Sequence, residues 1–372
     1  MKAAFFTLGC KTNSYDTQAM QTVLKEAGYE IVEDIAQADV VVINTCAVTN
    51  VSEAKSRQAI RRAVKQNKEA VIVAAGCYSQ LNCEEVAALE GVDAVVGIQD
   101  RVLLADIIDR ARHQKVSAVR DMALEKCYEP LAIASYSDQT RAFIKIQEGC
   151  DRYCAYCIIP YARGISRSRA LSDILSEVWA LAGNGYKEIV ITGIHIASYG
   201  KDLAEDVALI DVIEAVAATG IKRIRLGSLE PKLLDSAFLK RLQAVGQFCP
   251  SFHISLQSGC DGTLKRMGRR YTTAEYFAIV ENVRAYFPHC SITTDVIVGF
   301  PQESEADFQA TMMFCKQAGF MKVHVFPYSK KRGTRAAELN GQILTKEKEA
   351  RSRRLVALSD ELGAAFYAAQ CG

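Results

Sequence analysis

The sequence lacks an excess of charge of either sign, and it lacks a hydrophobic run long enough to cross a membrane. Its 372 residues include 45 lysines and arginines against 43 aspartates and glutamates, a net charge of +2. Any affinity for nucleic acid must therefore come from local basic patches. The longest uncharged run, residues 242–260, is interrupted by Pro250 and rich in Gln, Ser and Gly, which excludes a membrane span.

A secretory leader is also missing. The apolar stretch before Cys10 is about six residues, shorter than the ~7–15 residues of a signal-peptide core. We therefore expect a cytoplasmic protein. Hydrophobic residues make up 49% and charged residues 24%, close to the globular average, so a disordered or collagen-like chain is excluded. At roughly 150 residues per domain, the length predicts two to three domains.

Short apolar runs alternate with helical patterns through the first third of the chain. The runs are continuous rather than alternating, which is typical of parallel strands covered on both faces. They lie at residues 3–8, 40–44, 70–74 and 94–96. We predict a small doubly wound parallel-sheet domain over residues 1–112, and we interpret the weakly periodic residues 113–140 as a linker.

A second series of strand-like runs occupies residues 141–329. Its members begin roughly 30 to 45 residues apart, as successive βα units require. They lie at residues 143–147, 188–192, 223–226, 252–256, 292–298 and 322–326. Thr272 and Ser304, each followed three positions later by an acidic residue, mark helix starts as capping boxes. Six units predict a parallel sheet, either an open partial barrel or doubly wound, followed by a basic helical tail over 330–372.

Thirteen cysteines are the abundant feature, and an odd number in a long cytoplasmic chain favours metal ligation or catalysis over disulfides. Cys150, Cys154 and Cys157 follow the first strand of the second series. A 4Fe–4S cluster normally takes four cysteines, so three would leave one iron open to another ligand. Zinc is the alternative, although zinc sites favour paired cysteines closed by a fourth ligand.

Three further cysteines, Cys10, Cys46 and Cys77, each follow a predicted strand of the N-terminal domain. The carboxyl ends of parallel strands form the binding edge of an open sheet, so these thiols can converge there. We interpret them as ligands of a second three-cysteine cluster. The alternative is three unrelated buried cysteines. The other seven cysteines show no ligand spacing.

These residues resemble the radical S-adenosylmethionine (SAM) methylthiotransferase family. The motif at residues 150–157, with Tyr156 before its last cysteine, is similar to the radical SAM signature, and the three N-terminal cysteines are similar to the family's extra cluster domain. Within the family, residues 192–195, 228–231 and 257–261 are most similar to the enzymes that modify threonylcarbamoyladenosine in tRNA. The resemblance covers nearly the whole chain.

The resemblance implies two 4Fe–4S clusters and SAM as cofactors, and a partial (βα)6 barrel over residues 141–329. The cluster at Cys150, Cys154 and Cys157 would bind SAM and reduce it to a 5′-deoxyadenosyl radical. That radical would remove hydrogen from C2 of a modified adenine at position 37 of tRNA. Sulfur would come from the second cluster, and a methyl group from another SAM. A reductant such as flavodoxin or ferredoxin is the implied partner besides tRNA.

The resemblance also assigns residues to the cofactor. Tyr156 is expected near the SAM adenine, and Thr192 and Gly193 near its amino group. Val298 and Gly299 are expected to pack against the adenine, with Gly299 allowing close backbone approach. Three strand-end residues complete the cofactor-binding set: Glu230, Ser255 and Gln257.

Arg163, Arg167 and Arg169 follow the cluster motif. We expect them to contact RNA phosphates, because arginine pairs with phosphate in a bidentate manner. The family usually continues into a small β-barrel, the TRAM domain, which helps to bind tRNA, whereas this sequence ends at Gly372. We therefore expect no complete TRAM barrel, and we expect the basic stretch 330–354 to carry more of the tRNA affinity.

Two alternatives stay open at this point. One keeps the chemistry but changes the substrate to another modified adenosine or to a ribosomal-protein side chain. The other is a non-catalytic iron–sulfur or zinc protein that binds RNA.

Overall fold

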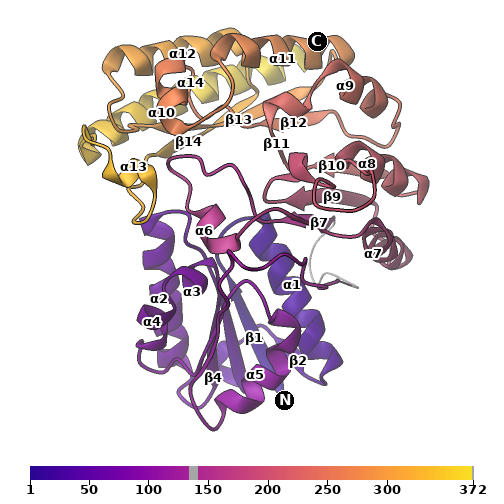
Figure 1. Cartoon of the computed structure of the whole chain (residues 1–372), viewed down its shortest axis with the longest axis vertical. Helices are drawn as coiled ribbons and strands as arrows, with labels where there is room; N and C mark the ends of the chain where they lie inside the picture. The colour runs from indigo at the N-terminus through magenta and orange to yellow at the C-terminus, as the bar shows by residue number, and fades with distance from the viewer. Residues whose placement is uncertain (134–140, 371–372) are drawn as a thin grey trace. The chain divides into compact units, whose positions relative to one another are not determined.

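The structure is a computed structural model that describes residues 1–133 and 141–370 (Figure 1). The chain divides into two compact units, each discontinuous in sequence. The first unit comprises Met1–Arg152, Ile158–Ile194 and Tyr199–Asp206, and the second comprises Tyr153–Cys157, His195–Ser198 and Val207–Gly372. Residues 134–140 of the expected linker and the last two residues of the tail lie outside the described residues.

A six-stranded sheet in the order β2-β1-β3-β4-β5-β6 forms the centre of the first unit. All neighbouring strands are parallel. The strands are β1 (Lys2–Thr7), β2 (Glu30–Val32), β3 (Val40–Thr45), β4 (Val71–Gly76), β5 (Ala94–Val96) and β6 (Val116–Ala118). Four of them were predicted, and β6 corrects the linker expectation, because residues 116–118 complete the sheet instead of connecting two domains.

Helices cover both faces of this sheet (Figure 1). The core on one face includes Met20 of α1 (Lys11–Glu26) and Ile108 of α5 (Leu104–Ala111). The opposite core includes side chains of α2 (Asn50–Gln66), α3 (Cys77–Leu81) and α4 (Cys83–Ala87). Every residue of β3 and β4 is buried, as expected for strands packed on both sides. The prediction of a doubly wound domain is confirmed.

The first unit also contains the beginning of the second strand series. Strand β7 (Ala142–Glu148) is buried along its whole length and pairs in parallel with β9 (Glu188–Gly193). The short β8 (Arg167–Ser168) pairs antiparallel with the end of β7. Helices α6 (Ile159–Arg163) and α7 (Leu171–Gly183) connect these strands.

The second unit is built on a parallel sheet in the order β11-β12-β13-β14. Its strands are β11 (Ser228–Leu229), β12 (Ser251–Ile254), β13 (Ser291–Val298) and β14 (Lys322–Pro327). Its remaining elements are β10 (Arg223–Leu226), α8 (Leu209–Ala218), α9 (Ser236–Gln243), α10 (Asp261–Met267), α11 (Thr273–Tyr286), α12 (Glu305–Ala318), α13 (Arg335–Glu338) and α14 (Thr345–Gln370). The predicted capping boxes at Thr272 and Ser304 are present at the starts of α11 and α12.

The α/β fold class is therefore confirmed, with an N-terminal parallel sheet followed by parallel βα units. After β14 the described residues form only the helices α13 and α14. No helix among residues 1–133 and 141–370 is long and apolar enough to cross a membrane.

Candidate active site

Cys10, Cys46 and Cys77 lie at the carboxyl ends of three neighbouring strands. Cys10 caps the start of α1, Cys46 directly follows β3, and Cys77 is the first residue of α3. The chain turns in opposite directions along the sheet after β1 and after β3, so Cys10 and Cys46 flank the position where open α/β sheets bind ligands. The turns that carry these cysteines lie close together: a Cβ on Gly9, next to Cys10, would lie 3.1 Å from Cβ of Cys46, and the charges of Cys10 and Cys46 both raise the pKa of the Cys77 thiol. That the three thiols bind one cluster stays a prediction.

Asn13 holds two of these strand ends together. Its Nδ2 donates to the carbonyl oxygens of Leu8, at 2.8 Å, and Thr45, at 3.0 Å. The Cys10 thiol donates to Oδ1 of the same side chain over 3.7 Å. Ser56 of α2 fixes Cys46, accepting its backbone N–H at 3.1 Å. These bonds set the positions of the thiol-bearing turns before any ligand binds.

Glycines precede Cys10 and Cys77 because the turns there leave no room for a side chain. Gly9 has φ +111° and Gly76 has φ +95°. A Cβ on Gly76 would lie 2.3 Å from Oδ1 of Asn44 and 2.7 Å from the Thr45 carbonyl oxygen. Only glycine satisfies both the backbone angle and this contact.

A buried guanidinium group lies beside Cys77. Nε of Arg163, whose side chain is 1% exposed, donates to Sγ of Cys77 at 3.2 Å. Burial raises the pKa of the Cys77 thiol to about 11, and the charge of Arg163 opposes that shift. Burial likewise raises the pKa of Cys46. Cluster ligands are thiolates, so Arg163 favours the ligand form of Cys77.

Arg163 belongs to a buried group of six charged side chains in the first unit. Three are basic and three acidic, so the group is neutral as a whole, and each side chain is at most 4% exposed: Asp16, Arg101, Glu129, Lys145, Glu148 and Arg163. We call this set the ion cluster. Arg163 bonds Oε1 of Glu148 at 2.8 Å and Oδ2 of Asp16 at 3.1 Å. Burial alone would raise the pKa of Asp16, but Arg101, Lys145 and Arg163 lower it below its usual value.

Cys150 follows β7 in the first unit and is buried. Its backbone N–H donates to the Gly164 carbonyl oxygen at 3.0 Å. The preceding Gly149 is packed tightly, because a Cβ there would lie 1.8 Å from the Ile165 carbonyl oxygen. The segment after α6 therefore fixes the start of the motif loop.

Cys154 and Cys157 lie in the second unit, and the Cys157 N–H donates to the Cys154 carbonyl oxygen at 2.9 Å. Ala155, between them, donates to Met267 and accepts from Ala336, both at 2.8 Å. Both thiols are partly exposed. This part of the loop is thus anchored through its backbone, and its two cysteines are only partly buried.

Arg269 is the counterpart of Arg163 in the second unit. Its Nη1 lies 3.6 Å from Sγ of Cys154, and its Nη2 donates to Oε2 of Glu230 at 3.1 Å. Nε donates to the Tyr271 hydroxyl at 2.9 Å. The side chains of Arg269 and Glu230 are 7% and 8% exposed. No motif in the sequence pointed to Arg269, which lies just after α10.

Several residues expected to bind SAM gather at the carboxyl ends of β11 to β13. Glu230 follows β11, Ser255 and Gln257 follow β12, and Val298 ends β13. Gln257 is held in a left-handed conformation, φ +74°, with its N–H bonded to the Asp295 carbonyl oxygen. Tyr156 packs against the apolar group that contains Met267 and Phe300.

Thr192 and Gly193 end β9 and belong to the first unit. A Cβ on Gly299 would meet Cγ of Lys348 at 2.4 Å. A lysine side chain of α14 therefore lies against Gly299, and the expected close approach of the SAM adenine to this backbone stays a prediction.

The expected phosphate contacts of Arg163, Arg167 and Arg169 are corrected by the structure. Arg167 is 1% exposed and donates to the carbonyl oxygens of Arg163 and Ile165. Arg169 is 4% exposed and pairs with Glu177 of α7. All three guanidinium groups are buried among protein groups of the first unit, so none presents a surface to RNA. Their basic sequence pattern indicated charge but not burial.

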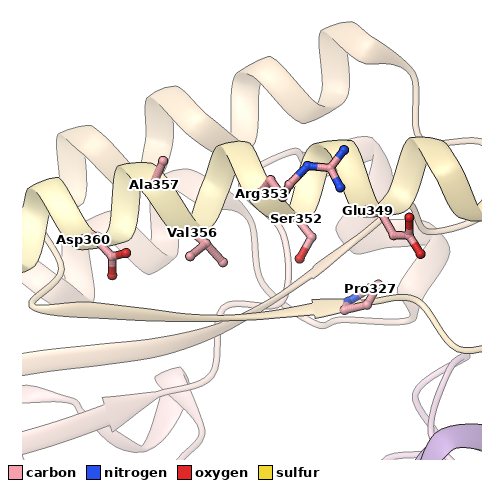
Figure 2. Close-up of a pocket in the computed structure, with 7 residues that line it drawn as sticks. All are labelled: Pro327, Glu349, Ser352, Arg353, Val356, Ala357 and Asp360. Atoms are coloured by element: carbon pink, nitrogen blue, oxygen red, sulfur yellow. The ribbon is translucent and has the colours of Figure 1, made fainter.

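The basic tail is only partly available to a polyanion. Arg351 of α14 is buried and pairs with Glu303 at 2.7 Å, whereas Lys346 and Arg353 are exposed. A hollow of about 440 Å³ lies between α14 and the end of β14. Figure 2 shows the side chains that line it. Its lining mixes one base with two acids: Pro327, Glu349, Ser352, Arg353, Val356, Ala357 and Asp360. The hollow itself is thus not a basic surface.

The donor sets suit iron–sulfur clusters. Cys10, Cys46 and Cys77 supply sulfur alone, and one of them, Cys77, accepts a hydrogen bond from the cation of Arg163. Within residues 1–133 and 141–370 no three His, Cys, Asp or Glu side chains surround a single metal position. The thiolates of a 4Fe–4S cubane bind different irons, so its cysteine sulfurs lie further apart than the ligands of a single metal ion.

Comparisons with known proteins cover almost the whole chain. Residues 2–97 match the model described as "Uncharacterized protein family UPF0004", and residues 144–315 match the Radical SAM superfamily. The chain is 43% identical to the threonylcarbamoyladenosine tRNA methylthiotransferase MtaB of Bacillus subtilis, over 99% of this chain and 82% of that protein. It is 40% identical to MtaB of Aquifex aeolicus, over 99% and 90%. It is 36% identical to the tRNA-2-methylthio-N(6)-dimethylallyladenosine synthase of Syntrophomonas wolfei, over 95% and 81%.

Solved structures share the fold at low sequence identity. The radical SAM methyltransferase TsrM from Kitasatospora setae has a TM-score of 0.64 and 15% identity, over 87% of this chain and 72% of that chain. The cobalamin-dependent radical SAM enzyme OxsB has a TM-score of 0.57 and 10% identity, over 96% and 56%. The identity and coverage of the sequence relatives carry the assignment: this chain belongs to the radical SAM methylthiotransferase family.

Proposed function

We propose that this protein methylthiolates C2 of the adenine in N6-threonylcarbamoyladenosine at position 37 of tRNA. The observation that carries the proposal is the 43% identity, over 99% of the chain, to a protein named for that modified nucleoside. The three N-terminal cysteines gathered at one sheet edge support it, because a sulfur-inserting enzyme needs a second cluster besides the one that binds SAM.

Radical SAM methylthiotransferases use 4Fe–4S clusters and SAM. We assign Cys150, Cys154 and Cys157 to the cluster that binds SAM, and Cys10, Cys46 and Cys77 to the second. Three thiolates leave one iron of each cluster without a protein ligand. When bound, these groups supply the radical that removes hydrogen from the substrate and the sulfur that replaces it.

The chain's own residues orient these groups. Asn13, with its two bonds to strand ends, fixes the Cys10 turn, and Arg163 holds Cys77. Glu230 is held by Arg269 at the end of β11. We infer that Tyr156, Ser255, Gln257 and the end of β13 line the SAM site beside it. We also assign Thr192 and Gly193, at the end of β9, to SAM binding.

The partners follow from the same proposal. tRNA is the substrate, and an anticodon-loop adenosine suits a buried reaction centre, because single-stranded bases can be splayed out of their stack. Reduction of the SAM-binding cluster requires an electron donor, for which a flavodoxin or ferredoxin is the proposed class.

The decisive experiment compares tRNA nucleosides by mass spectrometry from cells with and without the gene. Loss of the methylthio derivative of threonylcarbamoyladenosine is expected, with other methylthio nucleosides unchanged. Purified, reconstituted enzyme should convert tRNA that carries threonylcarbamoyladenosine. If cells without the gene keep unchanged tRNA nucleosides and instead contain an unmodified ribosomal protein, the proposed substrate assignment is wrong.

A second candidate substrate is dimethylallyladenosine in tRNA, favoured by the 36% identity to the Syntrophomonas wolfei synthase. Turnover of tRNA carrying that nucleoside, without turnover of the first, would select it. Metal analysis tests the non-catalytic alternative: about eight irons and SAM cleavage support the enzyme. Stoichiometric zinc without SAM cleavage would favour a binding protein.

A further inference from the structure

Each assigned cluster site contains one buried arginine within reach of a ligand sulfur. Nε of Arg163 lies 3.2 Å from Sγ of Cys77, and Nη1 of Arg269 lies 3.6 Å from Sγ of Cys154. Neither arginine belongs to the motifs that supply the cysteines. Each contact lies within one compact unit of the chain.

Both arginines are held in place by acidic or hydroxyl groups. Arg163 bonds Glu148 through Nη1 and Asp16 through Nη2. Arg269 bonds Glu230 and the Tyr271 hydroxyl, and its guanidinium carbon lies 4.9 Å from the centre of the Tyr271 ring. With their other N–H groups committed, the guanidinium groups cannot swing away from the sulfurs without breaking buried ion pairs.

A fixed cation beside a ligand sulfur changes the redox behaviour of a cluster. Hydrogen bonds to the sulfurs and the net charge around the cluster are two of the factors that set its reduction potential. The reduced cluster carries one more electron than the oxidised form. An N–H donor and a buried positive charge therefore stabilise the reduced form more than the oxidised form.

We propose that Arg163 and Arg269 are positioning residues that raise the reduction potentials of the two clusters, each through a hydrogen bond and a fixed positive charge on one ligand sulfur. The inference rests on the cluster assignments in the proposed function. The electron itself comes from the external reductant, and each cluster accepts one. The arginines change how readily that electron is held.

The test for Arg269 uses the full chain with Cys10, Cys46 and Cys77 replaced by Ala, so that only one cluster is reconstituted. In that background, Arg269→Gln removes the charge and Arg269→Lys keeps it without the forked geometry. The ratio of reduced to oxidised cluster is measured by electron paramagnetic resonance at a fixed solution potential. Arg269→Gln should lower this ratio about tenfold, which corresponds to a reduction potential lower by 59 mV for one electron. Arg269→Lys should lower the ratio of reduced to oxidised cluster less.

The matched control is Arg266→Gln. Arg266 lies in the neighbouring helix α10 and pairs with Asp307 at 3.2 Å, and its hydrogen-bond partners within the described residues are Thr263, Gln302 and Asp307, none of them a cysteine. Its loss should leave the ratio unchanged. A shift equal to that of Arg269→Gln would mean that any lost surface charge acts, and would overturn the specific role.

The test for Arg163 uses the full chain with Cys150, Cys154 and Cys157 replaced by Ala. Arg163→Lys is the first variant, because it keeps a cation between Asp16 and Glu148. Loss of the forked N–H donor should lower the reduced-to-oxidised ratio about threefold, roughly half of the 59 mV per tenfold step. Arg169→Lys is the control, since Arg169 pairs with Glu177 and donates to Tyr15 and the Asp173 carbonyl oxygen, and to no cysteine among the described residues.

Iron content separates the possible failures. A Cys→Ala background that fails to bind about four irons contradicts the ligand assignment and hence the proposed function. A variant arginine with the full iron content and an unchanged ratio overturns this inference alone. Loss of iron from both Arg269 variants would also overturn it, because the arginine would then be needed for assembly rather than for the potential.

Discussion

Asp16 of α1 and Lys145 of β7 are 129 positions apart in sequence, and Oδ1 and Nζ of the two side chains lie 2.6 Å apart. Each side chain is 2% exposed. The pair joins the first helix of the N-terminal sheet to the first strand of the second series. Asp16 also contacts Arg101 and Arg163, so one carboxylate balances several buried cations.

Asp16→Asn should destabilise the protein by ~3–5 kcal/mol, because it leaves cations of the ion cluster buried without their partner. The free energy of unfolding, measured by urea denaturation, checks this. Asp109→Asn is the control: Asp109 is 67% exposed and faces Arg112 at 3.9 Å, so its loss should cost at most about 0.5 kcal/mol. Equal effects of the two substitutions would contradict the role of the ion cluster.

Lowering the pH should reduce the free energy of unfolding through protonation of the Asp16 carboxylate. The pKa of Asp16 is lower in the folded protein than its usual value of 3.8, so the unfolded chain binds more protons in this range. The stabilisation is complete above about pH 3.8 and is lost as the pH falls through the folded pKa. Unfolding free energies between pH 3 and 7 should fall towards acid, less steeply for Asp16→Asn than for the unaltered chain.

Cys46→Ala should abolish methylthiolation while leaving SAM cleavage intact, because the assigned SAM-binding cluster keeps its three cysteines. Iron should fall from about eight to about four per chain. The two activities are measured separately, as the methylthio nucleoside and as 5′-deoxyadenosine. Cys83→Ala, which removes a thiol 3.0 Å from the Ser117 hydroxyl, should change neither. Parallel loss of both activities in Cys46→Ala would count against separate roles.

Gly76→Ala should impair the N-terminal cluster site more than its backbone strain alone predicts. The added Cβ would meet Asn44 at 2.3 Å, whereas Gly28, with φ +84°, has nothing within 4 Å of the same position. Gly28→Ala should therefore cost only the left-handed backbone penalty, ~1–2 kcal/mol. Gly76→Ala should cost more and lower the bound iron, and thermal unfolding with iron analysis compares the two.

Lys346→Ala and Arg353→Ala should weaken tRNA binding if the exposed part of the tail contacts the RNA backbone. Each lost phosphate contact should reduce the slope of log affinity against log salt by about 0.7–0.9. Titrations at several salt concentrations measure that slope. Lys240→Ala, an exposed lysine of α9, is the control. Unchanged slopes for both tail variants would place the tRNA contacts elsewhere.

The sequence predicted the positions of the thiols better than their surroundings. Continuous apolar runs reveal parallel strands, and strand ends share an edge, so the convergence of Cys10, Cys46 and Cys77 followed from pattern alone. Strands β2 and β6 are three residues each, and each includes a polar residue and exposed positions, so neither shows the continuous apolar run of the equally short but fully buried β5. They were therefore missed.

The arginines could not be placed from the sequence for a different reason. A basic residue in a loop looks the same whether it meets solvent or a buried carboxylate. Arg163 is buried only because Asp16 and Glu148, far apart in sequence, come together beside it. Arg269 reaches Cys154 across 115 positions, a contact that no local spacing encodes.

The ion cluster makes the N-terminal sheet dependent on sequence that lies beyond it. Arg101 is neutralised by Glu129, and Asp16 by Lys145 and Arg163, all of them later in the chain than residue 97, where the first family match stops. A polypeptide cut at that point would lose five of the six charges and keep only Asp16. The first family match therefore ends before strand β6, which completes the sheet beside β5, and before five members of the ion cluster.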